Sequence, residues 1–147
     1  MIVPVVKVRK LRAGAVMPER HSRDASGFDL AAGIDAPVVL APMARAAIGA
    51  GIAVEIPAGF EGQVRPRSGR ALKEGLALVN SPGTIDADYL GEVVVLAINL
   101  GAETITIHPG DRIAQLVIAP VVRAQIVEAD SLGASGRGDG GLGHTGR

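Results

Sequence analysis

Almost every apolar run in this chain is short, rich in Val, Ile and Leu, and closed by glycine or proline. Runs of this kind indicate β-strands, because branched apolar side chains fit a pleated, half-buried surface. Turn residues stand between the runs, as at 57–59, 81–83 and 108–111. We therefore predict an all-β fold. The expected strands are 2–8, 37–40, 46–57, 62–66, 76–80, 92–100, 104–108, 112–118 and 121–127.

Helical periodicity is nearly absent, and one short helix is expected over 68–74, with Ser68 as its cap and Gly75 beyond its end. The composition changes near the C-terminus: residues 133–147 contain seven Gly and one large apolar side chain, Leu142. Such a segment buries too little apolar surface to offset the entropy lost on ordering. We expect a single β-rich domain over 1–129 and a mobile Gly-rich tail over 130–147.

Charge and composition exclude several classes of function. Fifteen Lys and Arg balance fifteen Asp and Glu, which argues against a general nucleic-acid binder. The absence of Cys excludes disulfides and thiolate chemistry. No eighteen apolar residues occur in succession, and residues 1–12 lack a secretory pattern, so we expect a cytoplasmic protein with no membrane partner.

Two segments carry groups that can bind anions. Arg65, Arg67 and Arg70 surround a Ser and a Gly at the start of the expected helix. Guanidinium groups, a hydroxyl and backbone N–H groups can together hold an oxyanion. A turn with a solvated basic face explains the same residues equally well. Gln115 lies in an apolar strand, on the face opposite Arg112, Ala114 and Leu116, and needs a ligand or backbone partner.

The stretch 80–92 is the most informative. Asp86 and Asp88 are followed by the only Tyr, Tyr89, between two expected strands. A hairpin with Gly83 and Gly91 near its ends could grip a flat ring through backbone amides and carbonyls. Turn-forming Asp and Gly residues would give the same sequence. His21, His108 and His144 have no metal-ligand spacing, which argues against a zinc site.

Taken together, five segments resemble in order the five motifs of the trimeric deoxyuridine triphosphatases. The segments are 25–30, 67–69, 83–92, 110–116 and 137–146. This resemblance implies a jelly-roll-like β-barrel or sandwich and a homotrimer, in which each active site is assembled from several subunits. The implied reaction is hydrolysis of dUTP to dUMP and pyrophosphate, which lowers dUTP and supplies dUMP for thymidylate synthesis.

The resemblance also implies roles for the third segment. Asp86 would orient and activate the attacking water, and Tyr89 would pack on deoxyribose and leave no room for a 2′-hydroxyl. The backbone from Gly83 through Thr84 and Ile85 would read uracil. Asn80 would lie at the base of this hairpin, with Val94 near uracil on the return strand.

The remaining segments would meet the phosphates and close the site. Phosphate contacts are implied for Arg67, Ser68, Gly69 and Gln115. Arg137 would clamp the γ-phosphate as the tail closes, with Gly141, Leu142 and Gly143 over the base. Mg²⁺ would be held mainly by triphosphate oxygens and water. Asp29 would lie near the metal-bound waters or the sugar.

Two positions depart from the family pattern. Leu142 replaces an aromatic that stacks on uracil. Arg70 stands where Leu is common, and it either adds charge near the phosphates or faces solvent.

Two alternatives have the same fold: a dCTP deaminase and a non-catalytic nucleotide-sensing module. The deaminase needs a carboxylate on the strand after the hairpin, and residues 93–97 offer none.

Overall fold

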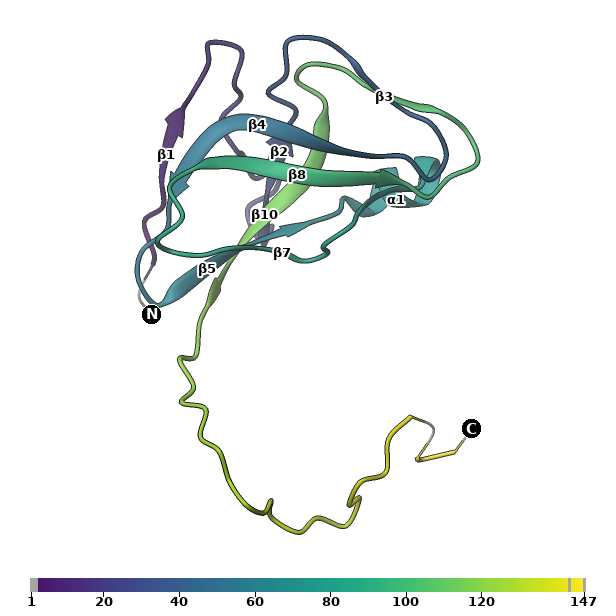
Figure 1. Cartoon of the computed structure of the whole chain (residues 1–147). Coiled ribbons are helices and arrows are strands. Elements are labelled where there is room, and N and C mark those ends of the chain that lie inside the picture. The colour runs from purple at the N-terminus through teal and green to yellow at the C-terminus, as the bar shows by residue number, and fades with distance from the viewer. Residues whose placement is uncertain (1–2, 143, 147) are drawn as a thin grey trace.

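The computed structural model describes residues 3–142 and 144–146, and within them the prediction of an all-β fold with one short helix is confirmed (Figure 1). The helix is α1 (Ser68–Glu74). The strands are β1 (Lys7–Lys10), β2 (Gly27–Ala31), β3 (Val38–Leu40), β4 (Arg45–Glu55), β5 (Phe60–Arg65), β6 (Leu76–Leu78), β7 (Gly83–Ile85), β8 (Glu92–Asn99), β9 (Ile105–Ile107) and β10 (Arg112–Pro120).

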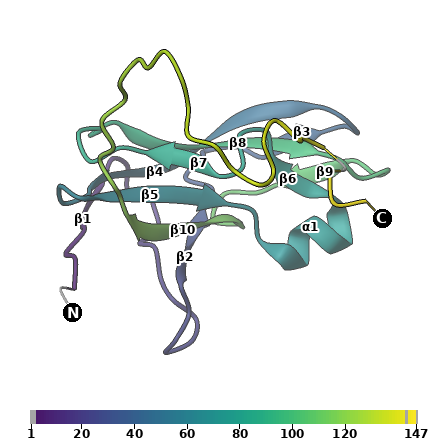
Figure 2. The same ribbon diagram turned by 90° about the horizontal axis from the view of Figure 1, so that it is seen from below.

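Two four-stranded antiparallel sheets form a jelly-roll-like sandwich, with strand orders β1-β4-β8-β6 and β2-β10-β5-β7. Figure 2 shows these sheets as two layers, with α1 at one end. A separate pair, β3 and β9, completes the body. Alternate residues of β8 face inward, so that Val93 and Val95 pack with Val64 and Leu116 of the other sheet in one core. The fold is thus a sandwich with no closed barrel among the described residues.

Helix α1 ends where the sequence predicts but begins differently. Gly75 has a φ of 75° and donates its N–H to the carbonyl of Ala71. A Cβ at Gly75 would lie 2.2 Å from the backbone nitrogen of Gly101, so this close approach also requires glycine. Ser68 is the first helical residue, and Arg67 occupies the cap position without a side-chain hydrogen bond. The expectation that Ser68 caps the helix was wrong.

Several strand predictions were also wrong. Strands β2 and β7 were not predicted, because Gly and polar residues interrupt their apolar pattern. The expected strand 121–127 is absent: β10 ends at Pro120, and Val122 and Ile126 are exposed. Only 7–10 forms a strand at the N-terminus, and Ile2 lies outside the described residues. Figure 1 shows the chain after β10 running away from the sandwich.

Among residues 3–142 and 144–146, no helix has the length and apolar character needed to cross a membrane.

Candidate active site

Asp29 on β2 lies between two guanidinium groups. Its Oδ1 accepts a hydrogen bond from Arg67 Nε at 3.1 Å, and its Oδ2 accepts one from Arg112 Nη1 at 3.0 Å. The Nε2 of His21 lies 3.3 Å from the same Oδ2. The carboxylate is mostly buried, with 17% of its side chain exposed. One negative charge therefore holds two positive charges in place and leaves the cluster net positive.

A β-bulge brings Arg112 to this cluster. The register between β10 and β2 shifts between Arg112 and Ala114, so one extra residue turns Arg112 onto the side of Gln115. Arg112 and Gln115 both line the hollow that contains Asp29. The expectation that Arg112 shares a face with Ala114 and Leu116 was therefore wrong. Sequence reasoning gave Arg112 no role of its own, although a charged residue at the start of an apolar strand was a usable signal.

Gln115 finds a backbone partner, one of the two options left open by the sequence. Its Nε2 donates to the carbonyl of Pro66 at 3.0 Å. Its Oε1 points at Gly27, where a Cβ would lie only 2.2 Å away. The missing side chain at Gly27 makes the room in which Gln115 lies.

Arg67, Ser68, Gly69 and Gln115, predicted from the sequence to bind phosphate, come together here, whereas Arg65 donates to Gln63 Oε1 and lines neither hollow. Two hollows of about 310 and 440 Å³ share Asp29, Arg67 and Gln115 as lining residues. Ser68 and Gly69 line the larger one. Guanidinium, hydroxyl and amide groups thus line two adjoining hollows, an arrangement suited to the oxygens of a phosphate chain. We call Arg67, Ser68, Gly69, Arg112 and Gln115 the cradle.

The stretch 80–92 is not a tight hairpin. Strand β7 pairs with β5, whereas β8 pairs with β4 and β6 in the other sheet. The stretch therefore crosses from one sheet to the other, because β7 finds its hydrogen-bond partner on β5. Gly83 and Ile85 are buried and Thr84 is exposed. The Asn80 side chain lies against Gly83, where a Cβ would be 3.0 Å from its Nδ2.

The groups that could carry chemistry on this segment face outward. Asp86 is exposed and lines a hollow with Arg123, and its carboxylate has no hydrogen-bond or ion-pair partner within the described part of the chain. Tyr89 is half exposed, and its hydroxyl donates to the carbonyl of Glu92 at 2.8 Å. Val94 is exposed on the outer side of β8.

The sequence gave no role to Arg12, which holds the end of this segment. Its Nη2 donates to both carboxylate oxygens of Glu92 at 2.8 Å, and the Gly51 N–H donates to one of them at 2.8 Å. Arg12 also donates to the carbonyl of Gly33. Glu92 is therefore committed to a structural pairing at the start of β8.

Asp86 lies far from the cradle within one chain. Ile85 pairs with Gly62 near the start of β5, whereas Arg67 follows the other end of that strand. With a rise of about 3.3 Å per residue, Asp86 and Arg67 are roughly 20 Å apart. A single subunit therefore brings the cradle residues together but does not bring Asp86 to them.

Among the described residues, those predicted for the tail have only local hydrogen bonds. Arg137 Nε donates to the carbonyl of Gly140 at 2.6 Å, and its Nη2 donates to that of Gly141 at 3.2 Å. Leu142 is fully exposed. Gly143 lies outside the described residues.

The donor set fits a metal that arrives with a phosphate ligand. Residues 3–142 and 144–146 contain no group of three or more His, Cys, Asp or Glu side chains placed to hold an ion. Both oxygens of Asp29 already accept hydrogen bonds from arginines. Mg²⁺ commonly keeps several waters and binds through substrate phosphates, which suits a site built from cationic donors.

Comparisons with known proteins agree with this geometry. A sequence model of the dUTPase family matches residues 13–146. The deoxyuridine 5′-triphosphate nucleotidohydrolase of Syntrophotalea carbinolica is 52% identical over 141 residues, covering 96% of each chain. The enzyme of that name from an Anaeromyxobacter species is 54% identical over 145 residues, covering 97% of each.

Solved structures give the same result. The dUTPase of Staphylococcus bacteriophage 80alpha with dUpNHpp has a TM-score of 0.89 and 29% identity, covering 97% of this chain and 99% of that one. A substituted dUTPase from phage phi11 of S. aureus, described with a structural Mg(II) ion, has a TM-score of 0.78 and 29% identity, covering 86% and 97%. With the sandwich, the cradle and the match over residues 13–146, this chain belongs to the dUTPase family.

Proposed function

We propose that this chain hydrolyses dUTP to dUMP and pyrophosphate. The observation that carries the proposal is the cradle, in which Arg67, Ser68 and Gln115 line hollows around Asp29 in a chain of the dUTPase family. Phosphoryl transfer depends mainly on positioning and charge stabilisation, and the cradle offers donors rather than a nucleophilic side chain. The reaction lowers dUTP and supplies dUMP for thymidylate synthesis.

Asp86 is the proposed general base. Its carboxylate is exposed and free of side-chain partners in the described residues, so it is available to accept a proton from water. The water oxygen bonds to the α-phosphorus, and the bond from that phosphorus to the oxygen bridging the α- and β-phosphates breaks. Pyrophosphate leaves with the electron pair of that bond.

The cradle and the tail bind the triphosphate in this proposal. Arg67, Ser68, Gly69 and Gln115 donate to phosphate oxygens. The net positive charge around Asp29 supports this assignment. Arg137 meets the γ-phosphate when the tail 130–147 closes over the site of the domain 1–129. Mg²⁺ held by the triphosphate oxygens would supply neutralising charge, and Asp29 is the carboxylate of this cluster that would lie nearest to its waters.

The segment 80–94 binds the nucleoside in this proposal. Backbone groups of Gly83, Thr84 and Ile85 read uracil, with Asn80 below and Val94 beside it. The half-exposed Tyr89 ring packs on deoxyribose. The hydrogen bond from its hydroxyl to the Glu92 carbonyl holds the ring in one orientation, which supports a steric role against a 2′-hydroxyl.

We infer that the active unit is a homotrimer with shared sites. The separation of about 20 Å between Asp86 and Arg67 supports this inference, since both must reach one triphosphate. Val79, Val94 and Leu96 form exposed apolar positions on β8 and beside β6, which suit a subunit interface. Gly141, Leu142 and Gly143 reach the base from a subunit's tail. A cytoplasmic location, without nucleic-acid or membrane partners, stays a prediction.

The two alternatives have less support. Residues 93–97 of β8 contain no carboxylate, and Glu92 at its start is paired with Arg12 and the Gly51 N–H. This chain therefore lacks, at this strand, the free carboxylate that a deaminase would need. A non-catalytic nucleotide sensor would leave the free Asp86 carboxylate without a function.

Turnover of purified protein with Mg²⁺ tests the proposal. We expect selective cleavage of dUTP to the monophosphate when dUTP, dCTP, dTTP and UTP are offered side by side. In oxygen-18 water the label should enter dUMP, as attack on the α-phosphorus requires. Label only in pyrophosphate would overturn the mechanism, and binding without turnover would favour the sensor.

A further inference from the structure

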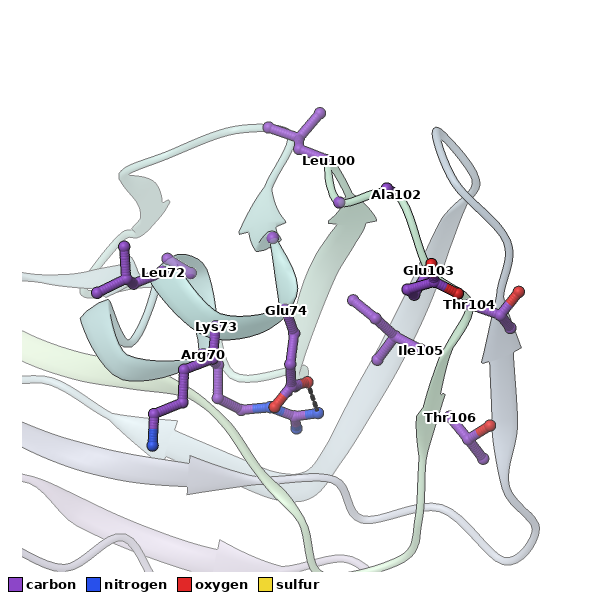
Figure 3. Close-up of a pocket in the computed structure, with 13 residues that line it drawn as sticks. Arg70, Leu72, Lys73, Glu74, Leu100, Ala102, Glu103, Thr104, Ile105 and Thr106 are labelled. Atoms are coloured by element: carbon purple, nitrogen blue, oxygen red, sulfur yellow. Dashed lines mark hydrogen bonds and ion pairs between the residues drawn. The ribbon is translucent and has the colours of Figure 1, made fainter.

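Arg70 lines the larger hollow beside Arg67, Ser68 and Gly69, but its guanidinium is already paired and little of it reaches solvent. Its Nε donates to both carboxylate oxygens of Glu74, at 3.1 and 3.0 Å, and its Nη2 donates to Oε2 at 2.5 Å. Figure 3 shows this contact on α1. Only 16% of the Arg70 side chain is exposed. The guanidinium is therefore held against its own helix, between two hollows that both include Arg70 and Glu74 in their walls.

A second carboxylate connects Arg70 to the start of β10. Arg70 Nη1 lies 3.9 Å from Asp111 Oδ2, which also accepts the His108 N–H at 2.9 Å. The Asp111 carbonyl accepts the Ala32 N–H at 2.8 Å, just after β2. Asp111 is thus fixed by the backbone around it, and Arg70 ties α1 to that fixed point.

This contact repeats the arrangement around Asp29. Arg67 and Arg70 lie one helical turn apart, and Asp111 directly precedes Arg112. Arg67 reaches Arg112 through Asp29, while Arg70 reaches Asp111 directly. Two ionic links therefore join the start of α1 to the start of β10, the two elements that carry the cradle.

We propose that Arg70 is a positioning residue for triphosphate binding. With Glu74 and Asp111 it fixes the start of α1 relative to β10, and thereby the spacing between Arg67 and Arg112. It makes no contact with the triphosphate itself. This inference rests on the proposed function, because it assigns the cradle to a phosphate chain.

A direct phosphate contact by Arg70 makes the opposite prediction for Glu74. If Arg70 bound phosphate, removing the competing Glu74 charge would free the guanidinium and reduce repulsion, so affinity would rise. If Arg70 positions the helix, the loss of Glu74 loosens α1 and affinity falls. The sign of the change in Glu74→Gln separates the two roles.

The experiment measures the dissociation constants of a non-hydrolysable dUTP analogue and of inorganic triphosphate, with Mg²⁺, for the full-length protein. Arg70→Leu, Glu74→Gln and Asp111→Asn should each weaken binding by about two- to fivefold, and Arg70→Leu/Glu74→Gln should be no weaker than Arg70→Leu alone. Glu55→Gln is the matched control, since it removes a carboxylate from the exposed Lys7–Glu55 pair and should change nothing.

Tighter binding in Glu74→Gln, or additive losses in the double variant, would overturn the inference. Thermal unfolding measurements check that each variant is folded. If Glu74→Gln does not fold, Asp111→Asn takes its place in the test. Wild-type protein that binds inorganic triphosphate without hydrolysing dUTP would overturn the proposed function alone, and the triphosphate series would still decide the role of Arg70. Binding of neither ligand would overturn both.

Discussion

Asp86 and Arg67 lie at opposite ends of β5. Asp86 follows Ile85, which pairs with Gly62, and Arg67 comes two residues after the last residue of the strand. The separation of roughly 20 Å exceeds what either side chain can span. Under the proposed function both act on one triphosphate, so we expect Asp86 and the phosphate donors of one site to come from different subunits.

Mixed trimers test this separation directly. Asp86→Asn and Arg67→Ala variants should each be nearly inactive. Unfolding and refolding them together at equal amounts should restore about a quarter of wild-type activity, because random assembly gives that share of sites an intact Asp86 and an intact Arg67. The measurement is dUTP turnover before and after mixing. Activity that does not recover, in trimers shown to be mixed, would place both residues in one subunit's site.

Asp86→Asn should lower kcat by roughly two to four orders of magnitude, because it removes the proposed base while keeping the side chain's shape. The affinity for a non-hydrolysable dUTP analogue should change little. Asp88→Asn is the matched control, because it removes another exposed carboxylate of the same segment. Its kcat should stay near that of the wild type. A change confined to affinity would assign Asp86 to binding.

Gly27→Ala should disturb the cradle. The new Cβ would lie 2.2 Å from Gln115 Oε1, so Gln115 must leave the Pro66 carbonyl or β2 must shift. The close atom is the free end of a flexible side chain, so the thermal midpoint should fall only slightly, whereas triphosphate affinity should weaken because Gln115 is displaced from its place in the cradle. Gly14→Ala has no atom within 4 Å of its Cβ and should leave both measurements unchanged. An unaltered affinity in Gly27→Ala would show that Gln115 is not needed for binding.

Truncation after Ala129 should leave the body folded and assembled. The regular structure ends at Pro120, and residues 130–139 are exposed. Turnover should nevertheless be mostly lost, since the truncation removes Arg137 and the other tail residues that are proposed to bind the substrate. Sedimentation and dUTP hydrolysis measure the two effects. Full activity of the truncated trimer would mean that the tail takes no part in the reaction.

Leu142→Phe should tighten binding by a few-fold up to about tenfold. Base–aromatic stacking contributes about 1–3 kcal/mol, and leucine provides only an apolar contact. The contact between residue 142 and the base should be equally strong in the bound substrate and in the transition state, so Kd or KM should change and kcat should not. Titration of both proteins with the dUTP analogue measures the difference in affinity. Equal affinities would mean that Leu142 does not lie over the base.

Much of the fold was predictable because strands and turns have local signals. Short branched apolar runs identified most strands, and Gly75 marked the end of α1. Strand β7 was missed because its three residues include Gly83 and an exposed Thr84. The expected strand 121–127 failed for the opposite reason, since its apolar pattern is correct but β10 is already complete at Pro120.

The β class, the order of the five motif segments and the residues able to bind phosphate follow from residue type and near neighbours, and could be predicted. The position of Asp29 between Arg67 and Arg112, the pairing of Arg70 with Glu74 and Asp111, and the separation of Asp86 from the cradle became visible only in the folded chain. These relations depend on strand register, on one β-bulge and on which distant segments meet. A local pattern carries no information about such meetings, because they are set by the packing of the whole sandwich.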